Sequence, residues 1–194
     1  MSNNTTHYKL IVLGGSSGST EIIPSILHGL DGGLKTPMIV VRHLSADFGD
    51  TCYNEVLGQG CSINIKEAEH GERLEAGVVY LAPANYHLLV EQDMTLALNV
   101  DPRVKHCRPS IDVLFESAAD VCTDGLIGVL LTGANDDGAD GLQRIKALGG
   151  YTMVQDPATA QVPRMPEAAI ACCQVDEILA PEDIGIHLKK LLCG

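Results

Sequence analysis

The sequence contains no tryptophan, two phenylalanines and five tyrosines, and it has no long apolar run. With so few aromatic side chains, the chain offers little surface on which the bases of single-stranded nucleic acid could stack. No apolar segment approaches the roughly 20 residues that a membrane-spanning helix needs. The amino-terminal residues Met1 to Thr6 are polar and lack the apolar centre of a signal peptide. We therefore expect a cytoplasmic protein.

Positive charge is also scarce. The 194 residues include 13 lysines and arginines against 25 aspartates and glutamates, which gives a formal net charge of −12. Such a chain repels phosphate backbones and anionic membrane surfaces on average, which argues against both as partners. The seven cysteines are odd in number and form no Cys-x-x-Cys pair. The sequence therefore predicts neither a disulfide framework nor a zinc site, and we expect no metal and no cofactor.

What the sequence does contain is a regular alternation of short apolar runs with helix-like patterns. The runs that predict strands are Leu10–Leu13, Met38–Val41, Ile63–Lys66, Leu126–Leu131, Tyr151–Val154 and Val175–Leu179. The patterns that predict helices are Ile22–Leu30, Ala46–Leu57, Ile111–Val121 with Pro109 in its first turn, a segment ending near Ala147, Pro166–Cys173 and Pro181–Leu192. Three more short strands, Val78–Leu81, Tyr86–Val90 and Met94–Leu98, are spaced like antiparallel hairpins.

This alternation predicts an α/β fold, with a doubly wound, mostly parallel sheet, helices on both faces and a small antiparallel hairpin insertion. The sequence shows no internal repeat, low-complexity run or linker. We therefore expect residues 1–194 to form a single domain.

Three reactive side chains follow three of the predicted strands. Ser16 lies in Gly14–Gly18, which matches the pattern Gly-x-Ser-x-Gly, while His43 and Asp137 follow two other strands. Because the carboxyl ends of parallel strands meet at one edge of a sheet, we expect the three to converge. A serine needs a base to take its proton, and a carboxylate orients an imidazole for that task. We expect Ser16 Oγ within about 3–4 Å of one His43 ring nitrogen and Asp137 on the other.

Simpler interpretations of the same residues stay open at this point. The Gly14–Gly18 turn can be structural or can hold an anion at a helix N-terminus, and Asp137 can cap the helix that follows it. The acidic cluster Asp136, Asp137 and Asp140 can be a Mg²⁺ site or a solvated loop. The basic loop Arg103–Arg108 can offset local acidic charge or can contact an acidic protein partner, and we expect it at the catalytic edge.

The order serine, histidine, aspartate differs from that of the α/β-hydrolases, so the serine motif does not indicate an ordinary lipase or esterase. The sequence instead resembles bacterial chemotaxis protein-glutamate methylesterases of the CheB type. The segments that carry the resemblance, in the order of that family, are Ile11–Gly18, Val41–Leu44, Glu69–Arg73 with Tyr80–Pro83, Arg108–Phe115, Leu131–Ala139 and Met165–Ile170. They cover nearly the whole chain.

The resemblance implies hydrolysis of γ-glutamyl methyl esters on the cytoplasmic helices of chemoreceptors, with deamidation of glutamines as a second activity. It implies that Ser16 attacks, that His43 is the general base and then the acid, and that Asp137 orients His43. It places the oxyanion pocket at Ser17 and Ala134. The partner implied is a methylated chemoreceptor cytoplasmic domain.

The chain departs from the family in two ways. Ala134 stands where methionine is common and Asn135 where glycine is common, so we expect a different pocket lining. The family also places a phosphoacceptor receiver domain ahead of the catalytic domain, whereas this sequence begins almost at the first strand. We therefore expect activity without phosphorylation, set by abundance or by a receiver or other signalling protein in trans.

Two other functions stay open from the residues alone. One is a nucleotide- or phosphate-binding domain that uses the Gly14–Gly18 loop. It lacks the Gly-x-Gly-x-x-Gly pattern and the P-loop lysine, and His43 stands where a ribose-binding carboxylate would be expected. The other is a catalytically silent module that binds a receptor or a signalling protein.

Overall fold

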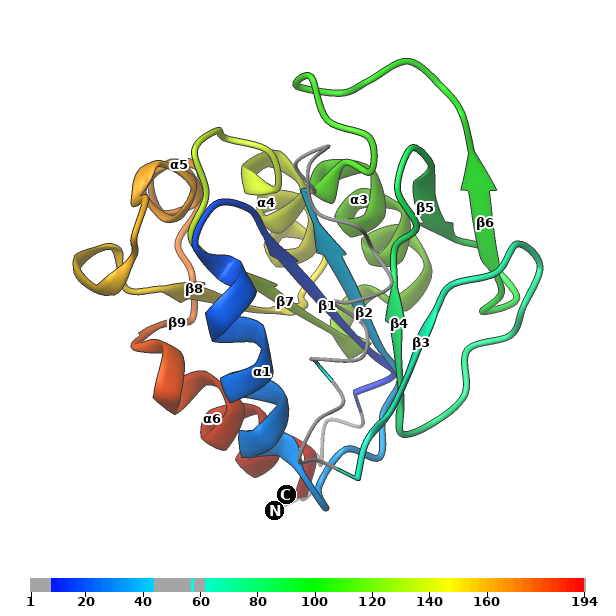
Figure 1. Cartoon of the computed structure of the whole chain (residues 1–194), viewed down its shortest axis with the longest axis horizontal. Helices are drawn as coiled ribbons and strands as arrows, with labels where there is room; N and C mark the ends of the chain where they lie inside the picture. Colours follow the sequence, from blue (N-terminus) through cyan, green and yellow to red (C-terminus); the bar gives the residue numbers. More distant parts are fainter. Residues whose placement is uncertain (1–7, 44–56, 58–61, 194) are drawn as a thin grey trace.

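A seven-stranded parallel sheet forms the centre of the protein in a computed structural model, which describes residues 8–43, 57 and 62–193 (Figure 1). All six strand pairs in this sheet are parallel. In spatial order the strands are β3 (Asn64–Glu67), β4 (Val78–Leu81), β2 (Met38–Arg42), β1 (Leu10–Gly15), β7 (Leu126–Leu130), β8 (Tyr151–Gln155) and β9 (Glu177–Leu179). The predicted doubly wound fold is therefore confirmed.

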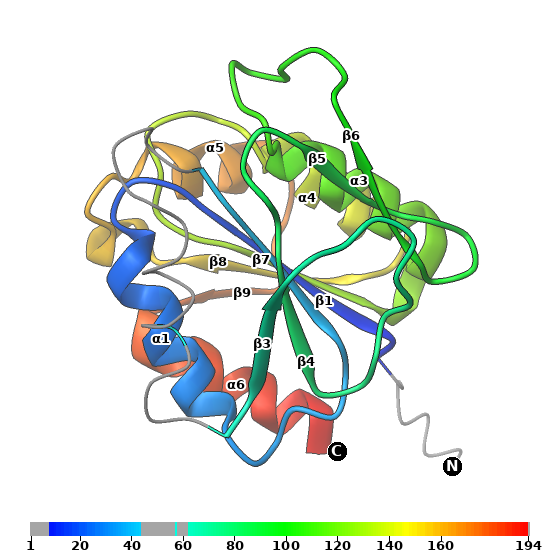
Figure 2. The same cartoon turned by 45° about the vertical axis from the view of Figure 1, so that its right-hand side comes forward.

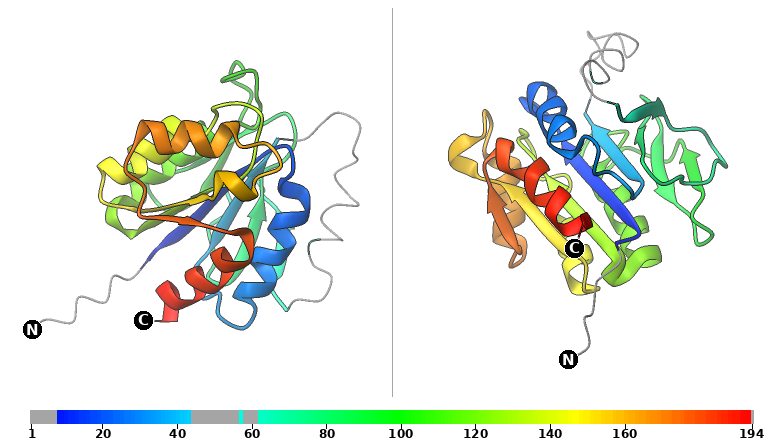
Figure 3. Two further views of the ribbon diagram at one scale, coloured as in Figure 1. Left: turned by 90° about the vertical axis from the view of Figure 1, so that its left-hand side faces the viewer. Right: turned by 90° about the horizontal axis from the view of Figure 1, so that it is seen from below.

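Helices cover both faces of the sheet, which is why its central strands are apolar throughout rather than alternating. On one face lie α1 (Ser19–Leu30) and α6 (Pro181–Cys193), and on the other lie α3 (Ile111–Cys122), α4 (Ala139–Ala147) and α5 (Arg164–Cys172) (Figure 3). Along β1, Leu10 and Val12 belong to the core under α3, α4 and α5, whereas Ile11 and Leu13 belong to the core under α1 and α6. Alternate residues of β1 thus contribute to two different hydrophobic cores.

The predicted antiparallel insertion is smaller than expected. Among the strands of the described residues, β5 (His87–Val90) and β6 (Leu96–Asn99) are the only antiparallel pair, and β5 contacts α3 outside the main sheet (Figure 2). The expectation that Val78–Leu81 belongs to this hairpin region is wrong, because β4 pairs in parallel with both β2 and β3. All four of its residues are buried, as befits an interior strand of a covered sheet.

The other element boundaries lie within about two residues of those predicted, except at the start of α1. The predicted helix Ala46–Leu57 falls outside the described residues apart from Leu57, which is helical and fully buried. No helix in the described part of the chain is long and apolar enough to cross a membrane.

The strand order positions the site. From β1 the chain moves to β2 on one side, and it later returns to place β7 on the other side of β1. The order therefore reverses between β1 and β7, and ligands bind at the carboxyl ends of strands at such a reversal. Ser16 follows β1, His43 follows β2, and the loop from Leu131 to Gly138 follows β7. All three segments leave the sheet at this edge.

The packing of α1 against α6 depends on two small residues at their closest approach. A Cβ atom on Gly185 would lie 2.5 Å from the backbone oxygen of Ile26 and 3.1 Å from Cα of Gly29. Backbone cannot yield as a flexible side chain does, so an added methyl must push the helices apart.

We predict that Gly185→Ala lowers the free energy of unfolding by about 1–2 kcal/mol, because overpacking outweighs the roughly 1 kcal/mol gain in helix propensity. Urea unfolding of the purified chain measures this. Ser25→Ala, at an exposed position of α1, is the control and should stay within about 0.5 kcal/mol of the parent. An unchanged or raised stability of Gly185→Ala would contradict the proposed close contact.

Candidate active site

Ser16 lies at the turn between β1 and α1, held by its backbone. Its N–H donates to the carbonyl of Thr132 at 2.9 Å, and its carbonyl accepts from both the N–H and the hydroxyl of Ser19. Gly18, the residue before α1, has a left-handed φ of 87° that favours glycine. The side chain of Ser16 is half-buried, while Ser17 is exposed. The strand–turn–helix geometry expected of the serine motif is present.

The loop after β7 approaches Ser16 closely because it contains a glycine at the contact. A Cβ atom on Gly133 would lie 3.0 Å from Cβ of Ser16 and 2.4 Å from Cε of Met165. The hydroxyl of Thr132 donates to the carbonyl of Ser17 at 2.9 Å. The two loops are therefore bonded to each other on either side of Ser16.

His43 follows β2 directly and faces the loop after β7. Its N–H donates to the carbonyl of Gly15 at 3.1 Å. Nε2 of its ring lies 2.7 Å from Oδ2 of Asp137, and the side chains are 12% and 0% exposed respectively. Residues 94 positions apart are thus in direct contact. The predicted contact between His43 and Asp137 is present in the structure.

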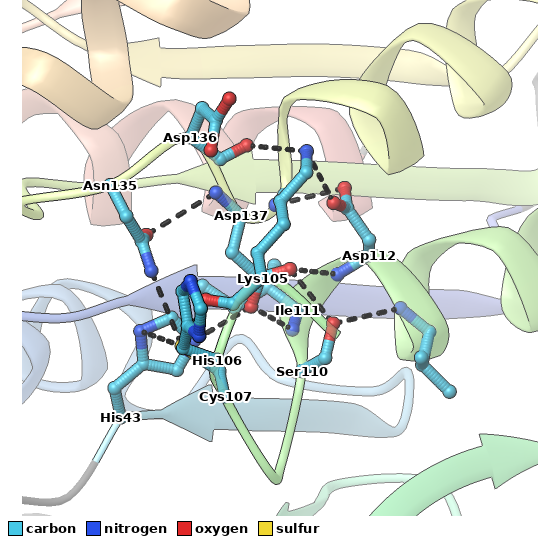
Figure 4. Close-up of polar contacts among 12 residues, drawn as sticks. His43, Lys105, His106, Cys107, Ser110, Ile111, Asp112, Asn135, Asp136 and Asp137 are labelled. Carbon is cyan, nitrogen blue, oxygen red and sulfur yellow. Dashed lines mark hydrogen bonds and ion pairs between the residues drawn. The ribbon is translucent and has the colours of Figure 1, made fainter. Parts of the chain in front are cut away.

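Asp137 is held by the beginning of α3 as well as by His43 (Figure 4). Its Oδ1 accepts from the hydroxyl of Ser110 at 2.8 Å and from the N–H of Asp112 at 3.1 Å, and its Oδ2 accepts from the N–H of Ile111 at 2.8 Å. Burial alone would raise the pKa of this carboxyl, but the bonds from His43 and from the α3 backbone lower it below its usual range. Asp137 is therefore ionised and fixed in position.

Asp137 thus caps α3, which precedes it in sequence, rather than the following helix α4 as one alternative had it. The backbone N–H groups at a helix start are unpaired within the helix and attract negative charge. Ser110 is the N-cap of α3, and its side chain accepts from the N–H of Val113. Pro109, expected in the first helical turn, lies before this cap.

Asp112 performs the same task for α4. Its Oδ1 accepts from the N–H groups of Gly138 and Gly141, each at 2.8 Å. Its Oδ2 lies 2.8 Å from Nζ of Lys105. Burial raises the pKa of Asp112 to about 6, although the bonds from Lys105 and Gly141 oppose that rise. The two helices are therefore capped reciprocally: Asp137, which precedes α4, bonds to the N-terminus of α3, and Asp112, which lies in α3, bonds to the N-terminus of α4.

The basic loop lies at the same edge of the sheet, as expected, but its lysine is bonded internally. Besides Asp112, Nζ of Lys105 contacts Oδ2 of Asp140 at 2.7 Å and the carbonyl of Asp136 at 3.0 Å. Arg108 donates to two backbone carbonyls of the same region. Lys105 therefore offsets local acidic charge, and Asp136 and Asp140 are arranged around an ammonium group rather than as a Mg²⁺ site.

Cys107 is the unexpected member of the site. Its Sγ lies 3.5 Å from Nδ1 of His43, and the side-chain amide of Asn135 donates to this sulfur at 3.2 Å. The structure shows no hydrogen bond between Ser16 Oγ and the His43 ring, both of which belong to its described part. The thiol of Cys107 therefore contacts Nδ1 of His43, the ring nitrogen that we expected Ser16 to contact.

The protonation of His43 reflects these neighbours. Burial would lower the pKa of the ring, but its bonds with Asp137 and with Cys107 outweigh that effect and raise the pKa to about 9. Oδ2 of Asp137 can only accept, so Nε2 carries a proton in either state of the ring. In the neutral ring, Nδ1 is consequently the basic nitrogen.

Two backbone donors are available beside Ser16. Within the described residues, the N–H groups of Ser17 and Ala134 have no hydrogen-bond acceptor. Ala134 is exposed on the loop that Gly133 brings against Ser16. Unpaired backbone N–H groups are the type of donor that stabilises an oxyanion.

A metal ion fits this arrangement less well than acid–base chemistry does. One ligand atom from each of His43, Cys107 and Asp137 lies within 4.8 Å of the others. Both carboxylate oxygens of Asp137, however, already accept hydrogen bonds from fixed donors. The set therefore contains a base, the carboxylate that orients it, and one thiol beside the base.

Comparison with known proteins gives a consistent result. A family model described as CheB methylesterase matches residues 11–188. A curated relative from Leptospira interrogans is 47% identical over 179 residues, covering 92% of both chains. The crystal structure of the Thermotoga maritima CheB methylesterase catalytic domain matches with a TM-score of 0.89 and 29% identity, covering 95% of this chain and 98% of that one.

Longer relatives match over part of their length. Proteins named protein-glutamate methylesterase/protein-glutamine glutaminase from Maricaulis maris and Geobacter metallireducens are 32% and 39% identical. The alignments cover 98% and 88% of this chain but 48% and 47% of theirs. The Leptospira relative has a provisional name with the same two activities. The chain thus spans about half the length of some relatives and nearly all of another.

We predict that Asp137→Asn lowers the pKa of His43 from about 9 by at least about one unit, because the charge that favours the imidazolium is removed. NMR titration of the labelled ring measures it. The raised pKa means that protonated His43 stabilises the native fold. That contribution is complete below about pH 6.5 and is lost as the pH rises through about 9.

The control for this titration is Asp136→Asn, since Lys105 contacts Asp136 through its backbone carbonyl. In that variant the His43 pKa should stay near the parent value. If His43 titrates alike in Asp137→Asn and in the parent, the carboxylate does not hold the ring.

Proposed function

Since the chain belongs to the CheB methylesterase family, we propose that it hydrolyses γ-glutamyl methyl esters on the cytoplasmic helices of chemoreceptors and releases methanol. Deamidation of glutamine side chains at comparable positions is the second activity proposed. The observation that carries this proposal is the buried His43–Asp137 pair beside the Ser16 turn. All of these groups follow strands that end at one edge of the sheet.

In the mechanism that we propose, Ser16 Oγ attacks the ester carbonyl while Nδ1 of the neutral His43 ring, which has lost its own proton, takes the proton of Ser16. Asp137 keeps the second ring nitrogen bonded and stabilises the imidazolium. The same proton then passes to the departing methanol. Water repeats the sequence on the glutamyl-serine ester, and glutamate leaves. For a glutamine, ammonia departs instead of methanol.

Two features of the site support the accompanying steps. In the proposed mechanism the unpaired N–H groups of Ser17 and Ala134 receive the oxyanion, a role that depends on backbone and so tolerates alanine at position 134. Before reaction, Nδ1 of His43 must exchange its contact with Cys107 for one with Ser16.

We predict that Ser16→Ala reduces methanol release from methylated receptor fragments by at least about 10³-fold, because the attacking hydroxyl is removed. Ser25→Ala, exposed on α1, is the matched serine control and should keep the parent rate. A fluorophosphonate probe should label the parent chain at Ser16 alone. An unlabelled parent without turnover would favour the silent binding module.

The exposed part of the basic loop gives a further test, on substrate docking. Arg103 is exposed, and the structure shows no carboxylate bound to it among the described residues. We propose that it attracts an acidic helical substrate in an otherwise strongly acidic protein. Lys105 is unsuitable for this test because it is bonded to Asp112 and Asp140.

We predict that Arg103→Glu lowers kcat/KM on receptor fragments by about threefold at low salt and that the difference shrinks at high salt, where screening weakens such attraction. Lys190→Glu, an exposed reversal on α6, makes the same change of net charge away from the site and should have little effect. Equal effects of the two reversals would leave net charge, rather than docking at Arg103, as the cause.

A further inference from the structure

The sulfur of Cys107 is arranged as a second nucleophile on the same base. Its Sγ lies 3.5 Å from Nδ1 of His43, whose Nε2 lies 2.7 Å from Asp137 (Figure 4). Nucleophile, base and orienting carboxylate thus follow one another as in cysteine hydrolases. The side-chain amide of Asn135 donates to the same sulfur at 3.2 Å. The sulfur therefore has a base beside it that can take its proton and an amide N–H that bonds to it.

The surroundings of Cys107 differ from those of Cys122, Cys172 and Cys193. Cys122 is buried among apolar groups, and that burial raises the pKa of its thiol to about 11. Cys172 and Cys193 are exposed, and the structure shows no histidine bonded to either sulfur in its described part. Cys107 is half-buried, so a small reagent can reach it. It combines access with an adjacent base.

We propose that Cys107 is a modification site, at which hydrogen peroxide oxidises the thiol to a sulfenic acid. The thiolate sulfur forms a bond to one peroxide oxygen, the O–O bond breaks, and hydroxide leaves and takes a proton to become water. Sulfur loses two electrons and peroxide gains them. A thiol reductant reverses the change with water as a product.

The consequence for hydrolysis rests on the proposed function. Asp137 occupies Nε2 of His43, so Nδ1 is the nitrogen left for Ser16. A sulfenic acid at position 107 places an added hydroxyl beside Nδ1, where it can donate a stronger hydrogen bond than a thiol does. The oxidised residue therefore competes with Ser16 for the base, and hydrolysis stops until the sulfur is reduced.

Mapping of the modified residues tests the chemical part without any need for turnover. The full chain is treated with limiting hydrogen peroxide and a dimedone probe, or with iodoacetamide, and each cysteine is followed by peptide mass spectrometry. We expect Cys107 to react at least tenfold faster than Cys172 and Cys193 at neutral pH. In His43→Gln it should slow at least tenfold, with Cys172 unchanged. Equal rates at Cys107 and Cys172, or no effect of His43→Gln, would overturn the proposal.

Turnover after peroxide tests the consequence separately. Parent chain and Cys172→Ser should lose methanol release in proportion to oxidation of Cys107 and regain it with dithiothreitol. Cys107→Ser should keep its own starting rate through the same treatment. A loss in Cys107→Ser as large as in the parent would refute the switch. Without turnover by any form of the chain the proposed function fails, and the mapping still decides the reactivity of Cys107.

Discussion

The reciprocal capping of α3 and α4 by two buried aspartates is the interaction on which the site depends. Asp137 precedes α4 but accepts hydrogen bonds from the beginning of α3, and Asp112 lies in α3 but accepts from the beginning of α4. Both carboxylates are buried, at 0% and 4% exposure. A buried charge persists only with partners, and two helix N-termini provide them at no cost to the helices, because these N–H groups are otherwise unpaired.

Because of this reciprocal capping, the position of the His43 ring is fixed by the packing of the helices. Asp137 cannot turn toward a different partner without leaving N–H groups of α3 unbonded, a loss of about 1–3 kcal/mol for each buried donor. The ring of His43 is consequently held by a carboxylate that is itself held by a helix. Lys105 completes the arrangement, since it neutralises Asp112 and Asp140 where several aspartates would otherwise repel one another. The strand reversal between β1 and β7 then brings Ser16 to the same place.

The sequence could predict those parts of this arrangement that depend on local pattern. Apolar runs predicted the strands, and the rule that parallel strands end at one edge led to Ser16, His43 and Asp137 as neighbours. The prediction that Val78–Leu81, the strand β4, belongs to a hairpin was wrong. Four apolar residues between turns have the same sequence pattern in a hairpin and in an interior parallel strand. The roles of Ser110, Asp112 and Cys107 could not be found, because none of the three follows a predicted strand and each depends on a partner more than 20 residues away. Lys105 and His106 also adopt positive φ angles, which cannot be predicted from their residue types because such angles are uncommon for residues other than glycine.

Nδ1 of His43 has two partners in the proposed mechanism: Cys107 before substrate binds and Ser16 during reaction. A thiol is a weak hydrogen-bond donor and acceptor, so its bond to Nδ1 at 3.5 Å orients the ring while costing little to break. A carboxylate or carbonyl oxygen at that position would hold the imidazolium more strongly and would keep the base from Ser16. Sulfur therefore suits a resting contact that must give way when substrate arrives. The same softness makes sulfur the atom in the site most readily oxidised, so the ease of exchange and the sensitivity to oxidant have one origin.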